Sequence, residues 1–312
     1  MKARHLIAAM LLLSLAACQT IDQETSLSER GKATADSAFF LTIKAVKSAD
    51  TKGLWIDNSG NKDALKTYWT NGDLVSVYRG GTWLGYLTAS CTGDKPTTAT
   101  LSGEVSIPGL AADQQLTLMI PGASQAGADW QYTQQDGTLS KVGSNYDYAT
   151  ATVTIQSIET TSGGTQAHVS AEAKFQNQQS IYRFTFSGLG SEVTVTDFSL
   201  SAQNAALVRS RAWDATANSG TGGWTSTPGS IVVNPGESAS GAFFVALRNE
   251  STAADNYNFY INGSDHALYL AAKPIPATVL SVPGKFINGT ITATKSNLHC
   301  TSGTIDNADN VF

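Results

Sequence analysis

Short apolar runs with a two-residue period recur along most of this sequence, and they constrain its fold more than any other feature. In residues 39–46, the side chains of Phe39, Leu41, Ile43 and Ala45 fall on one face of an extended strand. Turns rich in Gly and Asn separate the runs, and none of the runs shows a helical period over three turns. Many short strands joined by tight turns predict an all-β chain of antiparallel β-sandwiches.

The predicted strands divide into two groups at a glycine-containing turn, residues 161–164. We therefore expect an N-terminal β-sandwich domain over residues 38–162 and a C-terminal one over residues 165–312. Between Val195 and Phe198 the apolar phase slips by one residue, which predicts a β-bulge. The strands are expected at residues 39–46, 74–78, 82–88, 99–105, 115–120, 130–133, 149–158, 167–175, 181–186, 192–200, 230–234, 241–246, 256–261, 266–270 and 286–294.

One carboxylate, Asp73, lies between two tryptophans in the stretch WTNGDLVSVYRGGTW, residues 69–83. Asn71 and Gly72 tolerate a left-handed backbone, and an aspartate beside them accepts hydrogen bonds from nearby amides. The Gly80-Gly81 dipeptide suits a tight hairpin turn. The stretch therefore predicts a strand entry and a hairpin, with Asp73 as a turn residue whose loss costs about 1 kcal/mol.

The first 17 residues are typical of a bacterial lipoprotein signal peptide. Lys2 and Arg4 precede an apolar run, residues 6–17, which is too short to span a bilayer as a helix. The run ends in Leu-Ala-Ala before Cys18, whose thiol is the expected lipid attachment site. Several acyl chains on this residue would anchor the protein stably to a membrane. The alternative is an ordinary signal peptide with a chance cysteine.

Residues 18–37 are polar and lack apolar periodicity, so we expect a flexible tether. Cys91 and Cys300 remain after it, and in an oxidising compartment they either pair or stay as free thiols. No C-x-x-C or H-x-x-x-H spacing occurs, so no metal site and no cofactor are predicted.

Charge and motifs argue against two function classes. The formal net charge is −5 at pH 7 and becomes more negative once Lys2 and Arg4 leave with the signal peptide. An acidic chain without a basic patch is a poor partner for nucleic acid. No G-x-S-x-G elbow occurs, and the histidines are scattered, so we expect no enzymatic activity.

A carbohydrate-binding surface lipoprotein is the alternative function. Six tryptophans occur in the chain, and an exposed indole ring can stack against a sugar. Trp213 and Trp224 flank a glycine-rich segment, residues 218–223, and are the pair that we expect to be exposed. They are the candidate glycan contacts.

The chain resembles the fimbrillin family, the pilus-subunit lipoproteins of Bacteroidetes. The resemblance covers most of the sequence after the signal peptide. It rests on the lipoprotein signal at Cys18, the strand at residues 39–46, WTNGDLVSV at 69–77, QDGTL at 135–139 with YDYA at 146–149, FQNQQSIYRFTF at 175–186 and PGKFINGTI at 283–291. It implies two tandem transthyretin-like antiparallel β-sandwich domains and a location at the outer-membrane surface or in a fimbrium.

The resemblance also implies how such a chain assembles. A protease cuts after a basic residue in the loop that follows the first strand, and here Lys47 and Lys52 match that position. Loss of the first strand opens an apolar groove, which the C-terminal strand of another pilus subunit fills. The expected partners are other subunits, outer-membrane lipid through Cys18, and a host or bacterial surface ligand.

Two features leave this assembly open. Residues 296–312 lack sustained alternation and make a poor donor strand, which would suit a tip or anchor subunit. Cleavage at Arg30 instead would release only the tether. If nothing is cut, residues 39–46 form a permanent strand.

Overall fold

The structure is a computed structural model that describes residues 38–47, 55–57, 64–122, 129–162, 164–169, 171–204, 207–214, 217, 222–236, 241–251, 253–280 and 283–299. Cys18, Lys52 and Cys300 lie outside these ranges, so lipid attachment, cleavage at Lys52 and a pairing of Cys91 with Cys300 stay predictions. Within the ranges, no helix has the length and apolar character needed to cross a bilayer. Strands dominate, and the all-β class is confirmed.

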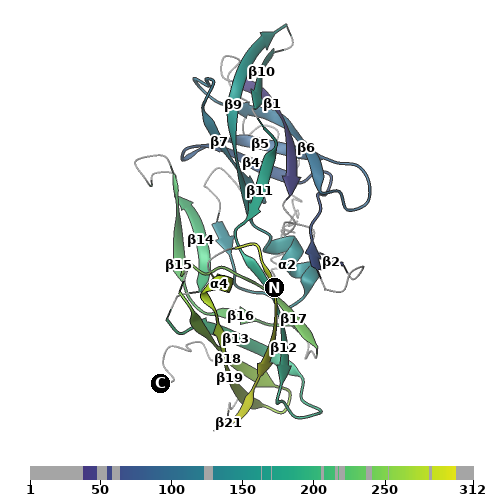
Figure 1. Cartoon of the computed structure of the whole chain (residues 1–312), viewed down its shortest axis with the longest axis vertical. Helices are drawn as coiled ribbons and strands as arrows, with labels where there is room; N and C mark the ends of the chain where they lie inside the picture. Colours follow the sequence, from purple (N-terminus) through teal and green to yellow (C-terminus); the bar gives the residue numbers. More distant parts are fainter. Residues whose placement is uncertain are drawn as a thin grey trace, which may run out of the picture. The chain divides into compact units, whose positions relative to one another are not determined.

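Eight strands form one continuous sheet, which we call the N-terminal ring (Figure 1). Its order is β10-β1-β11-β9-β7-β4-β5-β6, and β1 also pairs with β6, which closes the sheet on itself. The members are β1 (Ala38–Lys47), β4 (Leu74–Arg79), β5 (Thr82–Ser90), β6 (Thr98–Ser106), β7 (Gln115–Ile120), β9 (Ala149–Thr161), β10 (Gly164–Val169) and β11 (Ala173–Asn177).

Closure of the ring differs from the expected arrangement of two separate sheets. The reason is that β1 has hydrogen-bonded strands on both sides, so neither end of the sheet remains open. Alternating inward side chains fill the interior, including Leu41, Leu87 and Phe175. The transthyretin-like topology stays a prediction.

Two further sheets pack around a second core and form what we call the C-terminal sandwich. Phe184 packs edge-on against Phe259 across the two sheets, with ring centroids 5.1 Å apart. One sheet has the order β17-β12-β20, from β12 (Ser180–Ser187), β17 (Ala242–Leu247) and β20 (Phe286–Thr292). The other has the order β16-β13-β18-β19-β21, from β13 (Val195–Ala202), β16 (Ile231–Val233), β18 (Asp255–Gly263), β19 (Ala267–Ile275) and β21 (Thr294–His299).

The remaining elements are short. A fourth sheet has the order β15-β14-β8, from β8 (Asp129–Gln131), β14 (Val208–Asp214) and β15 (Gly223–Pro228). In a fifth, β2 (Trp55–Asp57) pairs with β3 (Ala64–Lys66). The helices that lie wholly within the described residues are α2 (Leu139–Asn145) and α4 (Ala277–Leu280).

The predicted boundary at residues 162–165 is not where sheet membership changes. β9 and β10 pair with each other across this turn, and β11 also belongs to the ring. Membership changes between β11 and β12. In addition, residues 129–148 lie between two ring strands in sequence, yet Trp130, Tyr132 and Tyr148 pack in the second core. A turn signal in the sequence marks a hairpin and does not show whether the chain moves to another sheet there.

Local patterns predicted most of the strands, but they missed β2, β3, β14, β15 and β21 and the helix α2. The single strand expected at residues 167–175 is two strands, β10 and β11. The register shift between Val195 and Asp197 confirms the predicted bulge. Residues 135–138 lead into α2, where the Thr138 hydroxyl accepts a hydrogen bond from the Lys141 amide at 3.1 Å. Asp136 in turn accepts hydrogen bonds from the Thr138 amide and hydroxyl, both at 2.8 Å. This N-cap is the signal that could have predicted the helix.

Candidate interaction site around the first strand

β1 is the strand that closes the N-terminal ring, and it is bonded along both edges. It runs antiparallel to β6 over nine registered residues, Ala38 to Val46. On its other side it runs parallel first to β10 and then to β11. If β1 were absent, both β6 and the β10–β11 edge would expose unpaired backbone groups.

The inward face of β1 fits its neighbours by size. Leu41 lies opposite Gly103 on β6 and Ala167 on β10, which are both small residues. Ala45 lies between Ala99 and Ala173. Leu41, Ile43 and Ala45 are fully buried, as the period of the sequence predicts. Phe39, expected on the same face, is only partly buried.

Lys47 ends the same inward face and is buried as well. Its ammonium donates a hydrogen bond to the Tyr68 carbonyl at 2.8 Å and lies 4.2 Å from the centroid of the Trp69 ring. The Asp73 Oδ2 is 3.7 Å from Nζ. We call these three groups, the Tyr68 carbonyl, the Trp69 ring and the Asp73 carboxylate, the lysine cage.

The burial of Lys47 is at odds with its expected role as a processing site. A protease that cuts after a basic residue must enclose that side chain, and here the lysine cage already does so. The sequence signal for this burial was present, because Lys47 follows Ala45 at the two-residue period of the inward face. Lys52 lies outside the described residues, so cleavage there stays a prediction.

Asp73 has the expected turn role and a second one. Its Oδ2 accepts a hydrogen bond from the Thr70 amide at 3.0 Å, which confirms the turn chemistry. The same oxygen faces Lys47, so Asp73 also balances a charge at the end of β1. Trp69 is buried in the ring core, where it meets Phe175 edge-on at 5.5 Å. The stretch from Trp69 to Asp73 is therefore architecture that holds the first strand.

Trp213 and Trp224 are partly buried and not an exposed pair. They lie opposite each other on β14 and β15, with ring centroids 5.2 Å apart. Trp224 also contacts Trp130 at 4.1 Å, and the Arg211 guanidinium lies over it at 4.7 Å. Tyr78 of the ring approaches Trp213 at 6.0 Å. These contacts use ring faces that a sugar would need.

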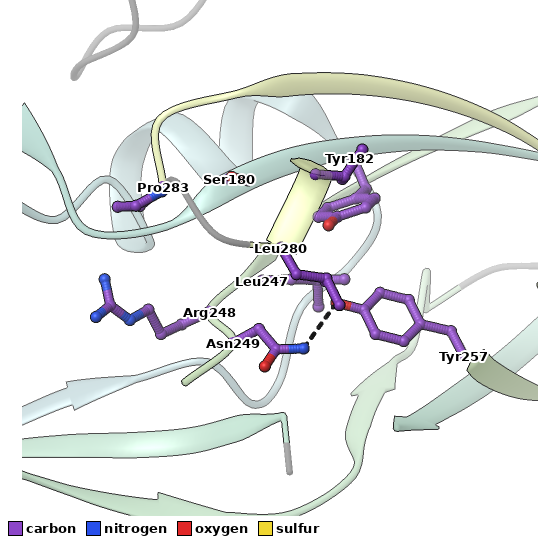
Figure 2. A pocket seen from close by; sticks show the side chains of 9 residues that line it. Ser180, Tyr182, Leu247, Arg248, Asn249, Tyr257, Leu280 and Pro283 are labelled. Carbon is purple, nitrogen blue, oxygen red and sulfur yellow. Dashed lines mark hydrogen bonds between the residues drawn. The ribbon is translucent and has the colours of Figure 1, made fainter. Parts of the chain in front are cut away.

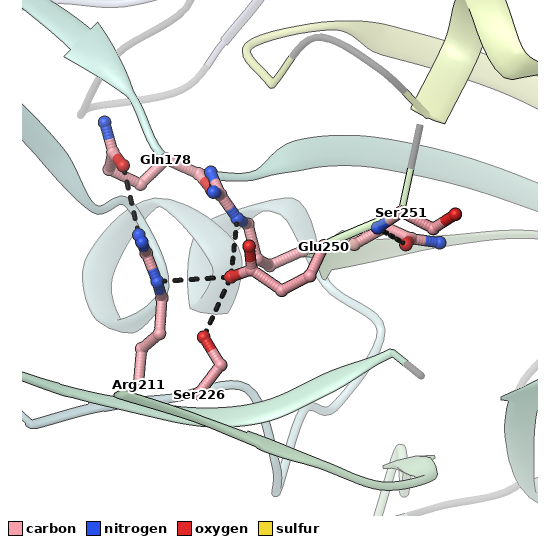
Figure 3. Close-up of polar contacts among 7 residues, drawn as sticks. Gln178, Arg211, Ser226, Glu250 and Ser251 are labelled. Atoms are coloured by element: carbon pink, nitrogen blue, oxygen red, sulfur yellow. Dashed lines mark hydrogen bonds and ion pairs between the residues drawn. The ribbon is translucent and has the colours of Figure 1, made fainter. Parts of the chain in front are cut away.

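A charged network surrounds the link between β11 and β12 (Figure 3). Arg211 donates a hydrogen bond to the Gln178 side chain at 3.2 Å, and Arg248 donates one to the Gln178 carbonyl at 2.9 Å. Both guanidiniums lie near the Glu250 carboxylate, at 3.4 and 3.5 Å, and Ser226 donates a hydrogen bond to it at 2.8 Å. Burial alone would raise the pKa of Glu250, but the Ser226 hydroxyl and the two arginines lower it overall.

Two cavities occur in the described part of the chain. Figure 2 shows one near Tyr182, Asn249 and Tyr257, where Asn249 donates a hydrogen bond to the Tyr257 hydroxyl at 3.4 Å. Its volume of about 10 Å³ suits a single water. A larger one of about 160 Å³ lies among Phe186, Val193 and Phe243. The described residues contain no group of three or more His, Cys, Asp or Glu side chains that could hold a metal ion.

Comparisons with known proteins give structural relatives only. No family model and no curated protein matches the chain. A candidate cell adhesion protein from Bacteroides ovatus is 12% identical with a TM-score of 0.41, over 84% of this chain and 98% of that chain. One from Bacteroides uniformis is 13% identical with a TM-score of 0.42, over 82% and 96%.

The tip fimbrial protein Mfa3 from Porphyromonas gingivalis, solved with a C-terminal truncation, is 11% identical with a TM-score of 0.34. The match covers 76% of this chain and 81% of that chain. With TM-scores below 0.5, these likenesses do not by themselves establish a function. The solved structures that this chain resembles are fimbrial and candidate adhesion proteins, the class that its sequence motifs imply.

Proposed function

We propose that this chain is a structural or adhesive subunit of a bacterial surface pilus, exported as a lipoprotein through Cys18. The observation that carries the proposal is the position of β1. This first strand of the fold closes the N-terminal ring, and it is joined to β6 and to β10 and β11 by backbone pairing along both edges. Backbone pairing does not depend on side-chain identity, so another extended segment can take the same place.

The energetics of strand replacement follow from the same contacts. Leu41 and Ile43 are fully buried, and burial of each is worth about 1.5–3 kcal/mol. Removal of β1 loses this burial and leaves two unpaired edges, so the opened ring would favour a replacement strand. The replacement must run antiparallel to β6 and parallel to β10 and β11. That geometry would join subunits into a filament.

The proposed role is mechanical and needs neither catalysis nor a cofactor. Processing would occur in the segment after β1, and Lys52 is the candidate site, since Lys47 is enclosed by the lysine cage. The lipidated Cys18 would hold the unprocessed chain at the outer membrane, and the remaining surface is available to a host or bacterial ligand. The carbohydrate alternative at Trp213 and Trp224 stays a prediction that a glycan array can test.

N-terminal sequencing of protein isolated from the cell surface tests the proposal, together with electron microscopy of cells with and without the gene. We expect filaments whose subunits begin just after Lys52. In Lys52→Ala, both the processed N-terminus and the filaments should be lost. Lys174→Ala, on the exposed side of β11, is the matched control and should leave both unchanged. Filaments built from chains that still begin at Cys18 would contradict strand replacement.

A further inference from the structure

The motif Thr-Ile-x-Ala-x-Lys occurs twice in this sequence, at residues 42–47 and 290–295. In both copies the Ile and Ala side chains are buried: Ile43 and Ala45 in the ring, Ile291 and Ala293 in the sandwich. The lysine that ends the second copy, Lys295, lies 2.8 Å from the Asp265 carboxylate and 5.9 Å from the Tyr269 ring. An aspartate and an aromatic ring therefore receive the terminal lysine in both places.

The two lysines differ in side-chain exposure, and the buried one, Lys47, depends more strongly on its partners. The Lys295 side chain is 56% exposed, so water can replace its partners. The Lys47 side chain is 0% exposed, and that of Asp73 is 10% exposed. Removal of one partner from a buried ion pair leaves the other charge uncompensated. An occupant of the β1 position without a cation would remove the positive charge that faces Asp73.

A cation site at the end of β1 would also fix the register of the strand in the β1 position. The inward positions filled by Leu41, Ile43 and Ala45 are all apolar, so a strand shifted by two residues still presents apolar side chains inward. Such a shift would move Lys47 away from Asp73 and the Trp69 ring. The lysine cage therefore distinguishes registers that the apolar pattern does not.

We infer that the lysine cage is a cation-binding specificity site, which selects and aligns the strand that occupies the groove of the N-terminal ring. The inference rests on the proposed function. The segment it accepts is an extended peptide with a Lys or Arg six positions after the residue that fills the Leu41 site. Residues 290–295 of a second copy carry the motif, whereas residues 296–312 contain no Lys or Arg.

The test uses the full chain with a site-specific protease sequence inserted within residues 48–54. The nicked protein is refolded from denaturant with an excess of labelled peptide, and uptake is measured. We expect the peptide of residues 38–47 to bind and its Lys47→Met form to bind at least about tenfold more weakly. The Lys44→Met peptide is the matched control, because Lys44 is exposed and pairs with Glu172 on the outer side. It should bind within about twofold of the natural peptide.

A variant of the chain separates the cation site from simple packing. Asp73→Asn keeps an acceptor for the Thr70 amide but removes the charge that faces Lys47. In this variant the difference between the natural and Lys47→Met peptides should shrink, as in a double-mutant cycle. A difference of unchanged size would overturn the role of Asp73 in selection.

A second pair of peptides tests the choice of segment. The peptide of residues 286–295 should bind more weakly than residues 38–47, because Gly289 stands where Leu41 does, and its binding should fall with Lys295→Met. The peptide of residues 296–312 should not bind. Equal binding of the natural and Lys47→Met peptides would overturn the cation site while strand replacement stands. A nicked chain that takes up no peptide, not even residues 38–47, would overturn both.

Discussion

In the N-terminal ring an entire strand, β1, closes the sheet, whereas in the C-terminal sandwich one glutamine side chain covers part of an edge. Gln135 donates a hydrogen bond to the Ala246 carbonyl of β17 and accepts one from the Ala246 amide, both at 2.8 Å. Its own carbonyl accepts from the Asn234 amide at 2.8 Å, and Gly137 accepts from the Phe244 amide at 2.7 Å. Gln135 therefore completes β17 as a short strand would.

Of the two closures, only the one made by β1 can be replaced by a segment of another chain. The pairing of β1 is a backbone ladder at the N-terminal end of the fold, so a cut after it frees a complete strand. Gln135 sits between ring strands in sequence, and its side chain is buried against the second core. It cannot leave without unfolding residues 129–148. The ring is therefore the part of this molecule suited to strand exchange.

The largest expected effect tests whether β1 is integral to the ring. Ile43→Ala removes a fully buried side chain and should lower the free energy of unfolding by about 2–5 kcal/mol. Thr42→Ala, on the exposed side of the same strand, should change it by no more than about 0.5 kcal/mol. Urea unfolding followed by tryptophan fluorescence measures both. Similar values for the two variants would mean that β1 contributes little to the ring.

The next effect tests the glutamine closure of the sandwich. Gln135→Leu leaves the Ala246 amide and carbonyl without their partner and should cost at least about 2 kcal/mol, since each of these two unsatisfied buried groups costs about 1–3 kcal/mol. Gln166→Leu on β10 is the matched control, because that side chain is exposed. Hydrogen exchange should become faster along β17 and not along β1. Faster exchange in β1 would show that the two closures are coupled.

A smaller effect concerns the segment that carries Gln135. Thr138→Ala removes the N-cap of α2 and should lower the free energy of unfolding by about 1 kcal/mol. Thr138→Ser keeps the hydroxyl and should restore most of the loss. If Ala and Ser behaved alike, the contribution of Thr138 would come from its methyl group and not from capping.

The smallest effect depends on pH. The pKa of Glu250 is lowered from its ordinary value of 4.5, so its carboxylate stabilises the fold above that pH, and this contribution is lost as the pH falls through the lowered value. Because the side chain is 44% exposed, Glu250→Gln should cost less than about 1 kcal/mol at pH 7. The difference in stability between this variant and the natural protein should narrow as the pH falls below 4.5. If this difference in the free energy of unfolding grew as the pH fell, the Glu250 carboxylate would not be the form that stabilises the fold.

Some of the candidate site could be predicted from the sequence, and some could not. The period of residues 39–46 gave the strand and its buried Leu41, Ile43 and Ala45, because alternation is a local property of an extended backbone. Continued by one step, the same period places Lys47 on the inward face, whereas we expected Lys47 in the loop after the strand, because a charged residue lies inside only if partners receive it. Those partners come from residues 68–73, and nothing local links them to β1. The exposed setting expected for Trp213 and Trp224 was wrong for the same reason. Trp130 and Arg211 contact Trp224 from other strands, and Tyr78 contacts Trp213.

The sequence by itself determined the all-β class, most strand positions, the Gly80-Gly81 hairpin and the bulge near Val195, because period, turn chemistry and phase are encoded within a few neighbouring residues. Only the tertiary structure decided that β1 closes a ring, that residues 129–148 join the second core and that Lys47 is enclosed. Each of these depends on which distant segments meet. Backbone pairing is nearly independent of sequence, so the choice among possible partners is made by the packing of the whole chain.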